Sequence, residues 1–204
     1  AKQKGTRLES LKVFICGGAA VPPQLIREAA AYLANASVTR VYGSTEVPVT
    51  TVGAPQPEEL DYAAESDGRP GLATVKIIEH VAAQSGEGEI CARGPQMLLG
   101  YLHPEDEAGS FDDLGYFRTG DIGREIKGPA ATYIQVTGRA KDIIIRNGEN
   151  ISPKELEDLL LDHPNVSDVA VVGRPHPKTG ERVCAIVIPT IKPGPDVSEL
   201  FNFL

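Results

Sequence analysis

Residues 11–46 read LKVFICGGAAVPPQLIREAAAYLANASVTRVYGSTE, and this stretch decides the fold of the N-terminal part of the chain. The apolar run at residues 11–16 is typical of a short strand and ends at two glycines. Pro22-Pro23 favours a helix start, because the first helical turn tolerates a residue without an N–H group. A second strand is expected at residues 38–42. The order predicts two parallel strands with a right-handed crossover, through a helix whose apolar residues have helical spacing: Leu25, Ile26, Ala29, Ala30 and Leu33.

A loop of small residues follows the first predicted strand. It reads Gly17-Gly18-Ala19-Ala20. In parallel sheets ligands bind at the carboxyl ends of strands, and residues this small permit a flat ligand to approach the backbone. A tight turn before the helix is the alternative interpretation.

The second strand ends in the loop Tyr42-Gly43-Ser44-Thr45-Glu46. A threonine hydroxyl there is able to donate to a phosphate oxygen, and a glutamate is a hard ligand for Mg²⁺. The glycine permits close backbone approach, and the tyrosine ring is able to stack on a base. An ordinary turn with a packed tyrosine explains the same residues, so the motif alone does not decide between a site and a turn.

From about residue 67 to residue 136 the pattern changes. Strands are expected at residues 74–78 and 89–93, separated by Gly86-Glu-Gly88, and turn signals recur at short intervals. This pattern predicts an antiparallel sheet or a small β-barrel.

A third pattern begins at Gly138. Residues 142–146 are expected to form a strand that ends in an Asn147-Gly148 hairpin turn. Residues 152–155 read Ser-Pro-Lys-Glu, a capping box with proline at the first helical position, and Leu156, Leu159 and Leu160 form the apolar stripe of the helix. Strands at residues 169–172 and 183–188 and an amphipathic helix that begins near residue 196 complete the start of a small α+β domain.

The fold class is therefore α/β, followed by a β-barrel-like subdomain and the start of a small α+β domain. The expected domains are residues 1–66, a parallel α/β segment; residues 67–137, the antiparallel part; and residues 138–204, a hinge with an incomplete α+β domain. Because the last predicted helix is cut short, the sequence is expected to be a truncated piece.

Composition excludes several classes of function. The net charge of −8 argues against a nucleic-acid surface, and the acidic runs at residues 58–67 and 105–113 are predicted to be solvated loops. The three cysteines, Cys16, Cys91 and Cys184, are expected to be small buried residues in a reducing compartment. The histidines have no zinc-ligand spacing, and we expect no membrane span and no signal peptide, hence a cytoplasmic protein.

Two further stretches carry candidate residues. Tyr116-Phe-Arg-Thr-Gly-Asp121 ends in an aspartate that either bonds its own turn or accepts hydrogen bonds from ribose hydroxyls. Residues 138–142, with Arg139 and Lys141, are either a solvated basic linker or a hinge that places charge beside a cleft.

Four motifs in one order resemble those of the adenylate-forming superfamily, which includes acyl-CoA synthetases, nonribosomal adenylation domains and luciferases. The first is the Tyr42–Glu46 loop, the second combines Gly88-Glu-Ile with Gly94, Met97 and Gly100-Tyr101, and the third combines Tyr116 with Thr119-Gly-Asp121. The fourth runs from Gly138-Arg through Lys141-Asp142, Gly148 and Asn150-Ile to Pro153, Glu155 and Glu157. The resemblance covers nearly the whole chain, and the fourth motif is especially similar to acyl-CoA synthetases.

The resemblance implies roles for individual residues in an ATP site. Gly18, Ala19 and Ala20 match the backbone beside adenine, Tyr42 the residue near the adenine ring, Thr45 the α-phosphate contact and Glu46 the Mg²⁺ ligand. Asp121 matches the ribose-binding acid and Arg139 the basic residue near ribose and phosphate. Lys141 matches a hinge, and Gly148 lies in the loop that approaches the pantetheine tunnel in relatives.

The implied activity uses ATP, Mg²⁺ and CoA: a carboxylic acid forms an acyl-adenylate, and a thiol then displaces AMP. Two features of the superfamily are not found in the sequence, a Ser/Thr/Gly-rich phosphate loop with a lysine and a lysine in a Gly-Lys context near the C-terminus. The chain alone is therefore expected to be inactive. Val47, Val49 and Val52 match positions that line the acyl pocket and favour an apolar acid. There are two alternatives. One is an aryl- or amino-acid-activating domain that loads a carrier protein, and the other is a non-catalytic nucleotide-binding module.

Overall fold

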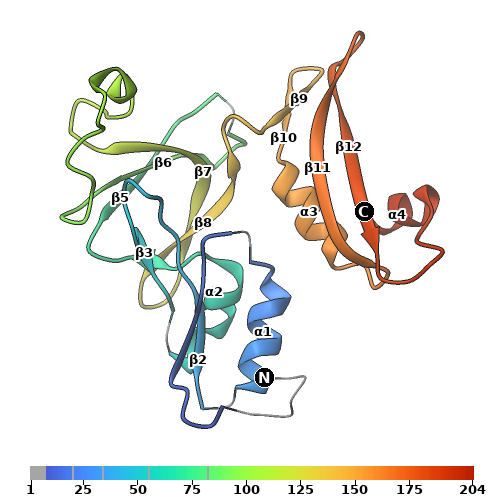
Figure 1. The fold of residues 1–204 in the computed structure, drawn as a ribbon, viewed down its shortest axis with the longest axis horizontal. Coiled ribbons are helices and arrows are strands. Elements are labelled where there is room, and N and C mark those ends of the chain that lie inside the picture. The colour runs from blue at the N-terminus through green and yellow to red at the C-terminus, as the bar shows by residue number, and fades with distance from the viewer. Residues whose placement is uncertain (1–7, 20, 34, 55, 82) are drawn as a thin grey trace.

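The computed structural model describes residues 8–19, 21–33, 35–54, 56–81 and 83–204, and Figure 1 shows three lobes in chain order. In the first lobe, strands β1 (Val13–Cys16) and β2 (Ser37–Arg40) pair in parallel, with Val13 opposite Ser37 and Cys16 opposite Arg40. The predicted parallel pairing is confirmed.

Helix α1 (Pro23–Tyr32) makes the crossover between these strands. Pro23 occupies the start of the helix, as predicted, where its missing N–H leaves no bond unmade. Ile26 and Leu33 are buried in the core of the lobe, whereas Leu25 is about half exposed. The apolar face of the helix therefore covers β2, and burial holds the crossover in place.

The acidic run at residues 58–67 was predicted to be a solvated loop, and this is wrong. It forms the short 3-10 helix η2 (Pro57–Glu59) and helix α2 (Leu60–Glu65), whose Ala63 and Ala64 are buried. Glu59 is also buried, because its carboxylate accepts a hydrogen bond from the hydroxyl of Tyr133. Packing therefore overrides the local charge pattern.

The second lobe is built on a four-stranded antiparallel sheet in the order β5 (Thr74–Ile78), β6 (Gly88–Arg93), β7 (Phe117–Lys127), β8 (Thr132–Arg139). The predicted antiparallel sheet is confirmed, with the expected strands at β5 and β6. The long strands β7 and β8 were not predicted individually. Between β6 and β7 lies the 3-10 helix η3 (Pro104–Glu107), in an acidic stretch that is largely exposed, as predicted.

The β-barrel expectation for this lobe needs a correction. A barrel closes only when its two edge strands pair with each other. In the part of the chain that the structure describes, β5 and β8 remain the two edges of an open sheet. Strands β3 (Thr51–Val52) and β4 (Arg69–Pro70) form a separate antiparallel pair that leads into this sheet from the first lobe.

The third lobe begins with the hairpin of β9 (Ile144–Arg146) and β10 (Glu149–Ile151). Its turn consists of Asn147 and Gly148, both with positive φ, as a two-residue hairpin of the predicted kind requires. The hairpin prediction is therefore confirmed.

The capping box is confirmed in one half. The Ser152 hydroxyl accepts a hydrogen bond from the N–H of Glu155 at 3.4 Å, and Pro153 begins helix α3 (Pro153–Leu161). The Glu155 carboxylate instead accepts from the Gln84 amide at 3.3 Å.

Helix α3 packs on the long antiparallel strands β11 (Val166–His176) and β12 (Gly180–Pro189). Ile144, Leu160 and Val171 form the buried core of this lobe. Helix α4 (Val197–Phe203) begins at Asp196, whose carboxylate accepts from the N–H of Glu199 at 2.8 Å. Across the described ranges, every helix is too short or too polar to cross a lipid bilayer.

Candidate active site

The two strand-end loops of the first lobe lie side by side. The N–H of Val41 donates to the carbonyl of Cys16 at 3.0 Å, so both strands end at the same edge. A Cβ on Gly17 would lie 2.7 Å from the Val41 carbonyl oxygen, which explains the glycine. Gly18 has φ +82° and Ala19 is exposed, whereas the predicted site residue Ala20 lies outside the described residues. The loop after β1 thus borders the residue just before Tyr42.

The Tyr42 loop is fixed by hydrogen bonds at both ends. Tyr42 makes two hydrogen bonds to Thr51: its N–H donates to the Thr51 hydroxyl at 2.8 Å, and its carbonyl accepts from the Thr51 N–H at 3.0 Å. Inside the loop, the Ser44 hydroxyl accepts from the N–H of Val47 at 3.1 Å. The loop is therefore a closed, ordered turn.

The middle of this loop folds back on itself, which explains Gly43. A Cβ at Gly43 would lie 2.5 Å from the backbone nitrogen of Val49, and no rearrangement of a flexible side chain relieves a clash with backbone. Val49 has φ +50°, a strained conformation for a β-branched residue. Thr45 is exposed at the bend, where its hydroxyl is open to solvent and to a ligand.

Tyr42, from the loop after β2, meets Asp121 of β7 and Arg139 of β8. The Tyr42 hydroxyl donates to one carboxylate oxygen of Asp121 at 2.6 Å, and Nε of Arg139 donates to the other at 2.8 Å. Asp121 is 7% exposed and stands directly opposite Arg139 in the pairing of β7 with β8. Asp121 therefore lies in a strand, and its interpretation as a turn residue is wrong.

The charges of this group are well defined. Burial and the neighbouring Asp121 carboxylate raise the pKa of Tyr42 well above its ordinary value, so the phenol stays protonated and donates. The hydrogen bond to Asp121 raises the pKa of Arg139. Each carboxylate oxygen of Asp121 keeps a lone pair beyond the protein donor that it already accepts from, so the group is able to bind two more donors.

Glu46 faces a second tyrosine. The hydroxyl of Tyr101 donates to the Glu46 carboxylate at 3.1 Å. Burial alone would raise the pKa of Glu46, but hydrogen bonds from its own backbone, from Ser44 and from Tyr101 outweigh it and lower the pKa. The carboxylate is therefore ionised at neutral pH, which suits a hard divalent cation. The described residues include no cluster of three or more His, Cys, Asp or Glu that would hold a metal by themselves.

Lys141 and Gly148 stand apart from this group. Lys141 is exposed in the tight turn after β8, where the N–H of Asp142 donates to the carbonyl of Arg139 at 3.0 Å. Gly148 is exposed at the tip of the β9–β10 hairpin. Among the described residues, the hydrogen bonds of the Asp121 carboxylate come from Tyr42 and Arg139 and not from Lys141 or Gly148. The predicted roles of Lys141 and Gly148 therefore depend on the resemblance alone.

The predicted acyl-pocket residues divide between the core and the surface. Val47 is fully buried among Ala73, Ala92 and Phe117, so it packs in the core and lines no pocket. Val49 and Val52 are 55% and 38% exposed. The interpretation of Val47 as a pocket residue is therefore wrong, because its side chain is fully enclosed by this core.

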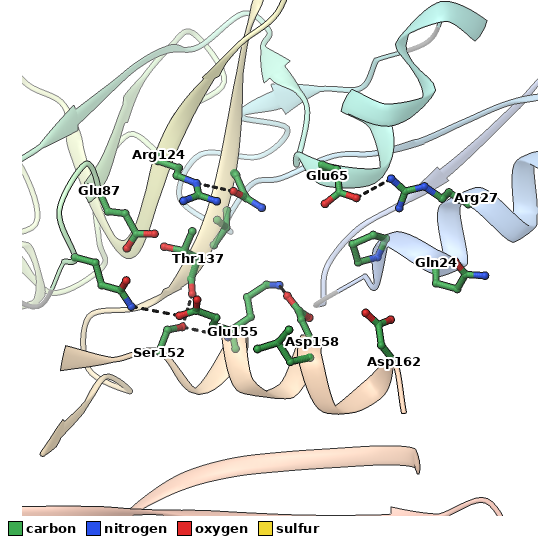
Figure 2. A pocket seen from close by; sticks show the side chains of 16 residues that line it. Gln24, Arg27, Glu65, Glu87, Arg124, Thr137, Ser152, Glu155, Asp158 and Asp162 are labelled. Atoms are coloured by element: carbon green, nitrogen blue, oxygen red, sulfur yellow. Dashed lines mark hydrogen bonds and ion pairs between the residues drawn. The ribbon is translucent and has the colours of Figure 1, made fainter. Parts of the chain in front are cut away.

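A charged crevice of about 360 Å³ lies elsewhere, between the three lobes (Figure 2). Arg27 of α1, Glu65 of α2, Arg124 of β7 and Glu155 and Asp158 of α3 point toward it. Arg27 pairs with Glu65 at 2.7 Å across the opening. None of the predicted nucleotide-site residues lines this crevice, so it is distinct from the group around Asp121.

Several motif residues around Asp121 have a structural role that the sequence did not predict. Glu89 accepts hydrogen bonds from Arg118 and from the N–H of Gly120, next to Asp121. The Thr119 hydroxyl accepts from the N–H of Asp121 at 3.1 Å. Glu89 belongs to the second motif, Gly88-Glu-Ile, but nothing in the local pattern indicates that its partner Arg118 lies 29 residues away.

Beside the paired parallel strands, a tyrosine, an aspartate and an arginine thus form one hydrogen-bonded group. The AMP-binding enzyme family model matches residues 1–102, and the model of the AMP-binding enzyme C-terminal domain matches residues 155–203. The chain belongs to the AMP-binding enzyme family.

The relatives catalyse different reactions. The chain is 37% identical over 187 residues to a medium-chain fatty-acid–CoA ligase of Escherichia coli, covering 89% of this chain and 32% of that protein. It is 34% identical over 208 residues to a 2,3-dihydroxybenzoate-AMP ligase of Bacillus subtilis, covering 100% of this chain and 38% of that protein. The chain thus spans about a third of the length of the curated relatives that it matches.

Solved structures agree in fold. The o-succinylbenzoate CoA synthetase of Bacillus subtilis in complex with an acyl-adenylate superposes with a TM-score of 0.80 at 29% identity, covering 99% of this chain and 41% of that one. An amide bond synthetase of Marinactinospora thermotolerans gives the same TM-score at 30% identity, covering 96% and 40%. The two neighbours share the fold of this chain, but their names describe different reactions.

Proposed function

We propose that the chain is part of an AMP-forming acyl-CoA synthetase that activates an apolar carboxylic acid. The observation that carries this proposal is the convergence of Tyr42, from the loop after β2, with Asp121 of β7 and Arg139 of β8. The free lone pairs of the Asp121 carboxylate accept the two ribose hydroxyls of ATP, while Arg139 forms an ion pair with that carboxylate and faces the ribose and phosphate. The Tyr42 ring borders adenine, beside the backbone of Gly18 and Ala19.

In the first half-reaction, an oxygen of the substrate carboxylate attacks the α-phosphorus of ATP. A new P–O bond forms, the bond to the β-phosphate oxygen breaks, and pyrophosphate leaves. Thr45 donates its hydroxyl to an α-phosphate oxygen, and the Glu46 carboxylate is the residue that would hold Mg²⁺, which supplies positive charge against the phosphates.

In the second half-reaction, the thiol of CoA attacks the acyl carbon of the adenylate. The C–S bond forms, the bond to the AMP oxygen breaks, and the thiol proton is lost. We propose that the third lobe turns about Lys141 between the two steps and brings the Gly148 hairpin to the pantetheine chain. The exposed turn after β8 and the exposed hairpin tip support this proposal.

A second candidate is an aryl- or amino-acid-activating domain that loads a carrier protein. The 34% identity to the 2,3-dihydroxybenzoate-AMP ligase and the 38% identity to a triostin synthetase of Streptomyces triostinicus favour it. Both candidates share the first half-reaction and differ in the acid and in the thiol. A nucleotide-binding module without catalysis is the third candidate.

The decisive experiment is ATP–pyrophosphate exchange by an enzyme that contains this chain together with a phosphate loop, using a panel of fatty, aryl and amino acids. Exchange with medium or long apolar acids, followed by AMP release on addition of CoA, is the expected result. Exchange only with aryl or amino acids supports the second candidate. The absence of exchange with every acid, with AMP binding retained, supports the third.

The 204-residue chain by itself is expected to form no acyl-adenylate. Its sequence contains no Ser/Thr/Gly-rich phosphate loop with a lysine and no Gly-Lys pair, so the pyrophosphate and the reacting carboxylate lack cationic partners. Pyrophosphate release should be measured with and without an acid from the panel. Acid-dependent release by the purified chain would contradict the expectation.

A further inference from the structure

Glu89 is a buried carboxylate in the strand next to Asp121. It lies in β6 and is 4% exposed. One carboxylate oxygen accepts from Nε of Arg118 at 3.0 Å and from Nη2 of the same side chain at 2.5 Å. The other oxygen accepts from the backbone N–H of Gly120 at 3.2 Å. Glu89 therefore bonds to Arg118 and Gly120, the two residues of β7 on either side of Thr119.

That segment is a bulge that contains Asp121. In the pairing of the two strands, Glu89 stands opposite Ile122 and Cys91 stands opposite Arg118. Thr119, Gly120 and Asp121 consequently lie opposite the single residue Ile90. Gly120 has φ +70°, a conformation that favours glycine. Bulges of this kind re-aim a side chain, and here the side chain is that of Asp121.

Two sets of hydrogen bonds, one from Thr119 and one from Glu89, stabilise the bulge. The Thr119 hydroxyl donates to the carbonyl of Ile90 at 2.7 Å and accepts from the N–H of Asp121 at 3.1 Å. The Glu89 carboxylate accepts from the N–H of Gly120 and forms an ion pair with Arg118. Without Glu89 the Gly120 N–H lacks this partner, and the bulge is free to relax toward regular pairing.

We infer that Glu89 is a positioning residue for nucleotide binding: through Arg118 and Gly120 it fixes the bulge that points the Asp121 carboxylate at Tyr42 and Arg139. This inference rests on the proposed role of Asp121 toward ribose. It assigns to Glu89 no contact with the nucleotide itself. In the proposed site the ribose hydroxyls are the nucleotide groups that bond to the Asp121 carboxylate itself, so removing one of them reports the position of that carboxylate.

The test compares AMP and 2′-deoxy-AMP binding to the full chain by calorimetry, for the wild type and for Glu89→Gln. We expect Glu89→Gln to lower AMP affinity about tenfold, as for a buried polar group that loses a charged partner, and to lower 2′-deoxy-AMP affinity less. The matched control is Glu59→Gln, which alters a second buried glutamate that is 7% exposed. Glu59 accepts from the hydroxyl of Tyr133 and has no bond to the bulge among the described residues. The control should leave the AMP to 2′-deoxy-AMP ratio unchanged.

A double variant separates positioning from general damage. In an Asp121→Asn background, Glu89→Gln should cause little further loss of AMP affinity, because both changes act through one carboxylate. If Glu89→Gln does not fold, Arg118→Lys takes its place, since a lysine keeps the charge but loses the two-nitrogen contact. A ratio in these variants equal to that of the wild type and of Glu59→Gln overturns the inference. A wild type that does not distinguish AMP from 2′-deoxy-AMP overturns the proposed ribose role itself.

Discussion

Asp121→Ala is expected to weaken AMP binding to the chain by roughly two to four powers of ten, because two charge-assisted hydrogen bonds to ribose of about 1.5–3 kcal/mol each are lost. The Asp121 carboxylate already accepts from Tyr42 and from Arg139 in the structure. The variant thus also leaves both donors without their shared acceptor. Binding should be measured by calorimetry with AMP and with adenine, and adenine affinity should change much less, since it carries no ribose.

Two controls accompany this experiment. Asp121→Asn keeps an oxygen for hydrogen bonding but loses the charge, so its effect should lie between the wild type and the alanine variant. Asp168→Ala removes an exposed carboxylate of β11 that accepts from the N–H of Val169 in its own strand, and it should leave AMP binding unchanged. Equal AMP affinity in the wild type and in Asp121→Ala would show that Asp121 serves only the packing of β7 against β8.

The elements that the sequence predicted well are those fixed by local chemistry. Pro22-Pro23 begins a helix because proline lacks an N–H, and Asn147-Gly148 forms a hairpin because both residues accept positive φ. Ser152 caps α3 through a hydroxyl that lies three residues from its partner. In each case the cause and the effect lie within a few residues, so no knowledge of the rest of the fold is needed.

The errors have the opposite cause. The helix at Leu60–Glu65 is stabilised by burial of Ala63 and Ala64 and by the stacking of Tyr62 on Tyr133, whose ring centroids are 4.6 Å apart. Tyr133 lies in β8, and its pKa is raised to about 12 by burial and by its hydrogen bond to Glu59. Local charge indicated a solvated loop, and only the distant partner reverses that prediction.

The candidate site shows the same division. Nothing local relates Tyr42 to Asp121, since 79 residues separate them. The resemblance put both in one site, and the structure brings both side chains into contact. Neither the local sequence nor the resemblance predicted the bulge at Thr119–Asp121. Glycine and threonine beside an aspartate are typical of a turn, and their place in a strand follows only from the pairing with β6.

Lys141→Pro is expected to separate the two half-reactions in an enzyme that contains this chain and a phosphate loop. Proline fixes φ near −65° and restricts the preceding Ala140 to extended conformations, so at most one arrangement of the third lobe stays unstrained. The N–H of Lys141 donates no backbone bond among the described residues, whereas those of Ala140 and Asp142 donate to Gly120 and Arg139. Loss of that N–H therefore breaks no backbone hydrogen bond among the described residues, and the effect comes from the restricted backbone of the turn.

We expect adenylation to be nearly retained and thioester formation to fall roughly 10- to 100-fold, as a backbone strain of about 1–3 kcal/mol in one arrangement would produce. Adenylate formation and transfer to CoA should be measured separately, by pyrophosphate release and by consumption of a preformed acyl-adenylate. Lys141→Ala is the matched control: it removes the same side chain but keeps the backbone free, so both steps should proceed. If the proline variant slows both steps equally and also melts at a lower temperature, the turn after β8 is a linker and the lobe does not turn about Lys141.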